Sequence, residues 1–144
     1  MKVEEQPKLR FNGVNIINVN FHSERSLVKD VDLDLDVRPK VFYPKDDKQF
    51  FKIIIELSLG AQNYFELDLL ALGSFQFDQE VEHEVKKQFA NMNAPAIMFP
   101  YIRSFVSTFT SNLGNVTGNI VMPTQFFDGE LEEVQNVDEN PTEE

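Results

Sequence analysis

The chain has 144 residues, no cysteine, and 24 acidic against 13 basic residues, giving a formal net charge of −11. This length favours one domain, the lack of cysteine excludes disulfides and thiolate metal sites, and the acidic balance argues against nucleic acid as a partner. No apolar run reaches the roughly 18 residues of a membrane span, and the N-terminal segment has no apolar signal core. We therefore expect a cytoplasmic protein that does not insert into membranes.

The acidic residues are concentrated towards the C-terminal end of the chain. Eight of the 24 lie between Asp128 and Glu144, a stretch that contains no basic residue. We expect residues 1–127 to form a single domain and residues 128–144 to be a flexible acidic tail. Such a tail usually serves solvation and repulsion, and contact with a basic partner is the alternative.

Four stretches have the pattern of β-strands. The first, Gly13–Phe21, alternates between apolar and polar residues with one irregularity. The second, Val31–Val37, alternates strictly and places its three aspartates on one face. The third and fourth, Gln49–Leu59 and Tyr64–Phe77, are more apolar and are joined by the short connection Gly60–Asn63. Consecutive strands with short turns predict an antiparallel meander.

Two helical segments follow the strands. The first is Asp78–Ala90, with its leading aspartate as a candidate N-cap. In Asn93–Gly114, apolar residues recur at helical spacing, with a proline near the start and an Asn/Gly stop. This apolar stripe is too wide and aromatic for one small subunit to cover. We therefore expect Phe105, Val106 and Phe109 to form core and an oligomer interface.

Strands followed by helices indicate an α+β fold. We predict a four-stranded antiparallel, meander-like sheet with one long helix packed on one face. The other face of the sheet is then either solvated or buried against a second copy of the chain.

Residue types that carry catalysis are sparse. The chain has only two histidines, and it contains no GxSxG elbow, GxGxxG turn or Walker loop. His83 stands between Glu82 and Glu84, but adjacent helical positions diverge and do not converge on one metal ion. The alternating aspartates before Val37 lack the glycine and glutamate of a calcium loop. We expect no enzymatic activity, no metal and no cofactor.

Phenylalanine is abundant, with 14 residues and no tryptophan. The residues can fill an ordinary core and subunit interfaces. They can equally form an exposed aromatic groove, because flat apolar surfaces bind many sequences without a fixed pattern of hydrogen bonds. The sequence pattern leaves both interpretations open.

Several short motifs resemble those of the SecB family of bacterial protein-export chaperones. The most specific is Ala94–Arg103, APAIMFPYIR, in the long helical segment. Weaker matches follow the family's order from about Phe11 onward, and they are Asp32–Asp36 (DLDLD), Leu57–Gly60 (LSLG), Gly73–Phe75 (GSF) and Pro123–Asp128 (PTQFFD).

The resemblance implies a homotetramer, built as a dimer of dimers, that acts as an ATP-independent holdase. Such a protein binds unfolded preproteins and delivers them to the Sec export machinery. The client groove that the resemblance and the aromatic residues suggest is lined by Phe75, Phe77, Ile97, Met98, Phe126 and Phe127.

The resemblance also implies that the outer sheet face contacts the translocase motor SecA, through Glu66 and Asp68. Two first-strand positions that are usually acidic in the family are Asn18 and His22 here, and Glu66 replaces an aliphatic residue. These departures favour an alternative, a SecB-like chaperone dedicated to a single client such as an antitoxin. A structural oligomer with no chaperone activity is a further alternative.

Overall fold

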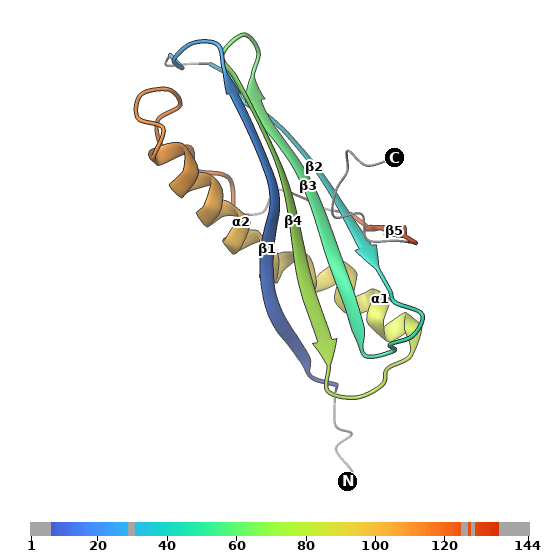
Figure 1. The fold of residues 1–144 in the computed structure, drawn as a ribbon. Coiled ribbons are helices and arrows are strands. Elements are labelled where there is room, and N and C mark those ends of the chain that lie inside the picture. Colours follow the sequence, from blue (N-terminus) through green and yellow to red (C-terminus); the bar gives the residue numbers. More distant parts are fainter. Residues whose placement is uncertain (1–6, 29–30, 125–126, 128, 136–144) are drawn as a thin grey trace.

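The described part of the chain forms one sheet and two helices, with both helices on the same side of the sheet (Figure 1). The computed structural model describes residues 7–28, 31–124, 127 and 129–135. In chain order, the elements are β1 (Leu9–Ser23), β2 (Asp34–Phe42), β3 (Phe50–Ala61), β4 (Phe65–Phe77), α1 (His83–Met92), α2 (Ala94–Ser111) and β5 (Glu132–Val134). The α+β prediction is therefore confirmed.

The strands are arranged in the order β1-β4-β3-β2-β5. The predicted meander describes β2, β3 and β4, but β1 pairs with β4 instead of β2. The two strands match along their whole length, from the pair Leu9 and Phe77 to the pair Ser23 and Phe65. A long connection after β1 leads to β2, which lies beyond β4 and β3 towards the opposite edge of the sheet. This is a Greek-key order.

β1 contains two register shifts, where the sequence pattern predicted one irregularity. They lie between Phe11 and Val14 and between Ile16 and Asn18. Gly13 occupies the first shift with a φ of 109°, a conformation that disfavours any side chain. The shifts allow β1 to keep its apolar residues towards the helices on both sides of each irregularity.

The core lies between the sheet and the helices. Alternate residues of each strand point towards α1 and α2, as period two requires. The fully enclosed side chains of this inner face include Phe51, Ile53, Ile55, Leu57, Leu67, Ala71, Phe75 and Phe77. We call the opposite side of the sheet the outer face.

α2 starts and stops close to the predicted limits, whereas α1 begins five residues later than predicted. α1 begins at His83, and Asp78 does not cap it; the Asp78 carboxylate instead accepts a hydrogen bond from the Lys8 N–H at 3.0 Å. In α2, Pro95 occupies the first turn, where a missing N–H has no cost, whereas Pro100 lies inside the helix. Pro100 therefore leaves one carbonyl of the first turn without its helical partner.

After α2 the chain returns along the helix and is held to it by hydrogen bonds. The Thr110 hydroxyl donates to the Val106 carbonyl at 2.8 Å and accepts from the Ile120 N–H at 3.0 Å. The Arg103 Nε donates to the Met122 carbonyl at 3.1 Å. Because Ile120 and Met122 are buried, this returning segment belongs to the core.

The structure corrects part of the prediction for the acidic tail. Leu131 is buried, and Glu132–Val134 form β5, which pairs in parallel with Lys40–Phe42 at the end of β2. The structured domain thus extends past residue 127, because an apolar residue and three strand residues anchor it. Residue 128 and residues 136–144 lie outside the described part of the chain.

Candidate functional site

Half of the predicted client groove is closed. Phe75, Phe77 and Met98 are at most 1% exposed, so the prediction that they line an open groove is wrong. Phe75 stacks on Phe51 with ring centroids 5.1 Å apart, and Phe77 meets Phe89 of α1 edge-on at 5.1 Å. The reason is strand alternation: Phe75 and Phe77 point to the inner face of the sheet, which the helices cover, and Met98 lies on the side of α2 that packs against this face.

The other groove candidates lie nearer the surface. Ile97 and Phe127 are half-buried, and Phe126 lies outside the described residues. Phe127 borders an apolar hollow of about 540 Å³ where α1 ends and α2 begins. We call this hollow the helix-end groove, and its lining is Asn91, Met92, Pro95, Ala96, Phe99, Pro100, Thr124, Phe127 and Gly129.

The helix-end groove is suited to apolar ligands. Met92 is 75% exposed at its rim, and its flexible thioether side chain can adapt to ligands of different shape. Most of the lining side chains are apolar or proline, with Asn91 and Thr124 as the polar members. Sequence reasoning missed Pro95 as a groove residue, although it falls within the motif of the long helical segment.

The predicted oligomer-interface residues divide into two groups. Val106 is fully buried within its own chain, so its assignment to an interface is corrected to core. Phe105 and Phe109 are half-buried and stack on each other with centroids 5.7 Å apart. Phe109 also meets Phe21 of β1 edge-on at 5.7 Å. An aromatic row therefore reaches the surface along α2, and its role in assembly stays a prediction.

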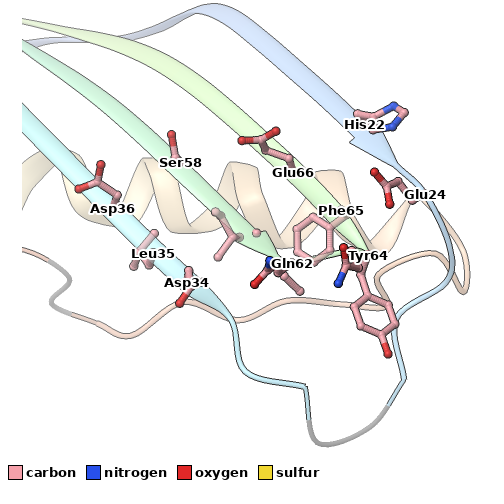
Figure 2. Close-up of a pocket in the computed structure, with 14 residues that line it drawn as sticks. His22, Glu24, Asp34, Leu35, Asp36, Ser58, Gln62, Tyr64, Phe65 and Glu66 are labelled. Atoms are coloured by element: carbon pink, nitrogen blue, oxygen red, sulfur yellow. The ribbon is translucent and has the colours of Figure 1, made fainter.

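The outer face carries an acidic end, shown in Figure 2. A hollow of about 530 Å³ lies there, bordered by residues of β1, β2, β3 and β4. Asp36, Ser58 and Glu66 project from the same side of the sheet (Figure 2). The Ser58 hydroxyl donates to the Asp68 carboxylate at 2.6 Å, so Asp68 is already engaged within the chain.

The predicted motor contacts sit opposite polar neighbours that carry no carboxylate. In the register of the sheet, Glu66 faces His22 and Asp68 faces Asn20 of β1. Glu66 is exposed and Asp68 is half-buried. Both lie on the outer face, and their contact with a motor stays a prediction.

The middle of the outer face is closer to neutral and partly apolar. Glu56 lies 3.7 Å from the Arg38 guanidinium and 3.5 Å from the Lys40 ammonium, which offsets its charge. Beside these pairs is a small apolar cluster, which sequence reasoning missed and which consists of Ile54, Leu70 and Leu72 with Phe42 and Val134 packed against them. The sequence did carry a sign of this cluster: Ile54, Leu70 and Leu72 are apolar, although strand alternation places them on the face opposite the core.

A second unpredicted feature lies on the inner side near β5. The Tyr43 hydroxyl is buried and has no hydrogen-bond partner among the described residues. Burial, reinforced by the Glu133 carboxylate, raises the pKa of Tyr43 to about 12. The Lys86 ammonium lies 5.5 Å from the Tyr43 ring centroid, and burial lowers the pKa of Lys86. The His83 ring meets Tyr43 edge-on at 4.8 Å.

These features are surface hollows, an apolar cluster and a buried tyrosine hydroxyl. Within residues that the structure describes, no three metal-ligating side chains come together. No helix in that part of the chain has the length and apolarity to cross a bilayer.

Comparison with known proteins connects the fold to the SecB-like chaperones. No protein-family model matches the chain. An uncharacterized protein of Methanocaldococcus jannaschii is 28% identical over 150 residues, covering 98% of this chain and 95% of that protein. Among solved structures, the Mycobacterium tuberculosis SecB-like chaperone Rv1957, in complex with a ChAD peptide from the HigA1 antitoxin, matches with a TM-score of 0.66. That match has 16% identity and covers 82% of this chain and 88% of the chaperone.

A protein of unknown function from Streptococcus agalactiae also shares the architecture. It matches with a TM-score of 0.51 and 9% identity, over 83% of this chain and 99% of its own. At these identities the likeness concerns the fold. The fold is SecB-like.

Proposed function

We propose that this protein is an ATP-independent chaperone that binds extended apolar segments of an unfolded client and keeps the client from aggregating. The observation that carries the proposal is the similarity, over 82% of the chain, to a SecB-like chaperone solved with a client-derived antitoxin peptide. The activity requires no bond chemistry, so the protein is proposed to act without a cofactor and without being an enzyme.

The proposed mechanism is mass action. A protein that binds the unfolded state lowers the concentration of free chains available for aggregation. The helix-end groove supplies one apolar contact, and the aromatic row of Phe105 and Phe109 supplies a second surface on the same helix. Several weak contacts along one client give affinity through multivalency, with little demand on sequence.

A single dedicated client is favoured over the pool of exported preproteins. The outer face has His22 and Asn20 beside Glu66 and Asp68, which dilutes the acidic surface that the SecB resemblance assigns to SecA. The neighbour with the bound antitoxin peptide points the same way. Delivery to the Sec machinery is the second candidate, and the acidic end of the outer face supports it.

Assembly follows from the same proposal. We infer a homotetramer formed as a dimer of dimers, because half-buried aromatic residues line α2 and β1 forms one edge of the sheet. Sedimentation velocity should give a mass near four times 16.6 kDa. A monomer at micromolar concentration would contradict this part of the proposal.

Suppression of aggregation tests the chaperone activity directly. A chemically unfolded protein is diluted into buffer with and without this chain, in the absence of ATP, and light scattering is followed. We expect suppression near equimolar ratio. The Met92→Asp variant places a charge in the helix-end groove and should weaken suppression, whereas Val121→Asp, at a valine that is 68% exposed elsewhere, should not.

Two further comparisons separate the client classes. A panel of unfolded proteins should show one strongly preferred client if the chaperone is dedicated, and similar affinities if it serves export. Titration with purified SecA should give no saturable binding in the first case. Absence of suppression by the native chain at several-fold excess would contradict a general chaperone and leave a single-client chaperone or a structural oligomer.

A further inference from the structure

β5 covers only part of an exposed sheet edge. β2 spans nine residues, Asp34–Phe42, and β5 pairs with the last three of them, Lys40–Phe42. The pairing begins directly after Pro39, which has no N–H to donate to a neighbouring strand. The usable part of this edge is therefore short, and the chain's own C-terminal segment occupies it.

The side chains of β5 match the chemistry of the edge beneath them. Glu132 is in register with Lys40, a pair of opposite charge on the outer face. Val134 is in register with Phe42 and packs on the apolar cluster of the outer face. The edge thus accepts an extended chain that carries an acidic residue and, two positions later, an apolar one.

The inner side of the same edge adds an unused hydrogen-bond donor. The buried Tyr43 hydroxyl, next to Phe42, has no acceptor among the described residues. The neighbouring Glu133 carboxylate is close enough to raise the pKa of Tyr43 but forms no hydrogen bond with its hydroxyl. The Tyr43 hydroxyl therefore has no partner among the described residues while β5 occupies the edge.

β5 is held by few interactions. A three-residue strand in a parallel ladder is a minimal element, and such elements open locally at small cost. Upstream, the Leu131 N–H donates to the Asn91 side-chain carbonyl at 2.7 Å, which tethers the strand to the end of α1. Opening can therefore stop at this tether and leave the domain folded.

We propose that the β2 edge at Lys40–Phe42 is a docking site for an extended segment of the unfolded client, and that β5 is an internal competitor that must leave first. This inference rests on the proposed chaperone function. Main-chain hydrogen bonds to the edge give affinity for any extended chain, while Lys40 and the apolar cluster select acidic and apolar side chains. The occupant is an unfolded client because β5, which now fills the edge, is itself a short extended segment with acidic and apolar side chains.

A reversible lock tests the competition. The chain has no cysteine, so Lys40→Cys with Glu132→Cys introduces a unique pair on neighbouring strands about 4.8 Å apart. A short thiosulfonate cross-linker joins the two thiols, and a reducing agent separates them. The probe is fluorescein-labelled, reduced and carboxymethylated α-lactalbumin, a permanently unfolded polypeptide, and its binding is followed by fluorescence anisotropy.

We expect the locked protein to bind the probe at least tenfold more weakly than the same protein after reduction. The opposite change comes from Val134→Asp, which removes the apolar contact of β5. If β5 occupies the edge most of the time, this variant binds the probe about three- to thirty-fold more tightly. Val121→Asp is the matched control and should bind like the native chain.

The outcomes are distinguishable. Equal binding by the locked and reduced forms, with Val134→Asp unchanged, overturns the docking site and leaves the chaperone function intact. Failure of every form to bind, including the reduced protein and Val134→Asp, overturns an edge that accepts any extended chain, and suppression of aggregation by the native chain then tests the chaperone function separately. Circular dichroism of each variant verifies that the sheet and helices remain folded.

Discussion

The hydroxyl of Thr110 offers a sharp test of what holds the returning segment to α2. Thr110 is fully buried, and its oxygen accepts the hydrogen bond of the Ile120 N–H at 3.0 Å. Ile120 is 7% exposed, so water has little access to this N–H if the hydroxyl is removed. The Thr110→Val variant keeps the shape of the side chain and removes the acceptor.

The expected cost follows from which group is left unpaired. The Val106 carbonyl, which also receives the Thr110 hydroxyl, keeps its ordinary helical hydrogen bond from a backbone N–H. The Ile120 N–H loses the hydrogen-bond acceptor that it has in the native chain. A buried donor left without an acceptor costs about 1–3 kcal/mol. We therefore expect Thr110→Val to lower the free energy of unfolding by about 1–2 kcal/mol, with Tm falling by about 3–8 °C.

Urea unfolding followed by circular dichroism measures this loss, at one fixed protein concentration because assembly shifts apparent stability. Thr108→Val, at an exposed position of the same helix, is the matched control and should change stability by less than about 0.5 kcal/mol. Thr110→Ser keeps the hydroxyl and should retain most of the stability. If Thr110→Val and Thr108→Val unfold at the same urea concentration, the hydrogen bond does not stabilise the segment.

Three further substitutions test other contacts. In Gly73→Val, the added Cβ meets the Met98 Sδ at 2.5 Å, so thermal melts should show a loss of about 1–3 kcal/mol that Met98→Ala partly restores. Tyr43→Phe removes an unpaired buried hydroxyl, and urea melts should show about 1 kcal/mol of added stability at pH 8. Because the folded-state pKa of Tyr43 is raised from 10.0 to about 12, the native chain should lose stability as pH rises through this window, and Tyr43→Phe should lose less. Asp78→Ala removes the acceptor of the Lys8 N–H and should cost about 1 kcal/mol in urea melts.

Much of the fold could be predicted because side-chain periodicity is a local property. The alternation before Val37 and the helical spacing around Phe99–Phe109 need only neighbouring residues to be recognised. The long helix was predicted at Asn93–Gly114 and lies at Ala94–Ser111. Its C-terminal end follows from Asn112, whose side chain donates to the Thr108 carbonyl at 2.8 Å.

The errors concern pairings between segments far apart in the chain. Nothing in Gly13–Phe21 indicates that its partner is β4, because alternation shows which faces a strand has and not which strand lies beside it. β5 was missed for a related reason. Its two glutamates read as part of a solvated tail, and only the position of Lys40 and Phe42 beside them makes a strand there favourable.

The candidate site was harder to predict than the fold, because a phenylalanine gives no sign of whether it faces the core or a ligand. Phe75 and Phe77 share a face with Phe51, and the helices happen to cover that face. Met92, by contrast, is 75% exposed at the rim of the helix-end groove. Exposure depends on where the next layer ends, which periodicity does not specify.

If the proposed chaperone function holds, the closed inner face limits where a client binds. Opening it would expose Phe75, Met98 and their neighbours together, a large loss of buried apolar surface at roughly 25 cal/mol per Å². A client that gains only a few kcal/mol from weak contacts cannot supply that free energy. The favourable sites are therefore those that a client reaches without opening the inner face, namely the helix-end groove, the aromatic row of Phe105 and Phe109, and the short edge that β5 covers. Since the Asn91 side chain borders the helix-end groove and bonds to Leu131 just before β5, a client can span the groove and the edge without disturbing the core.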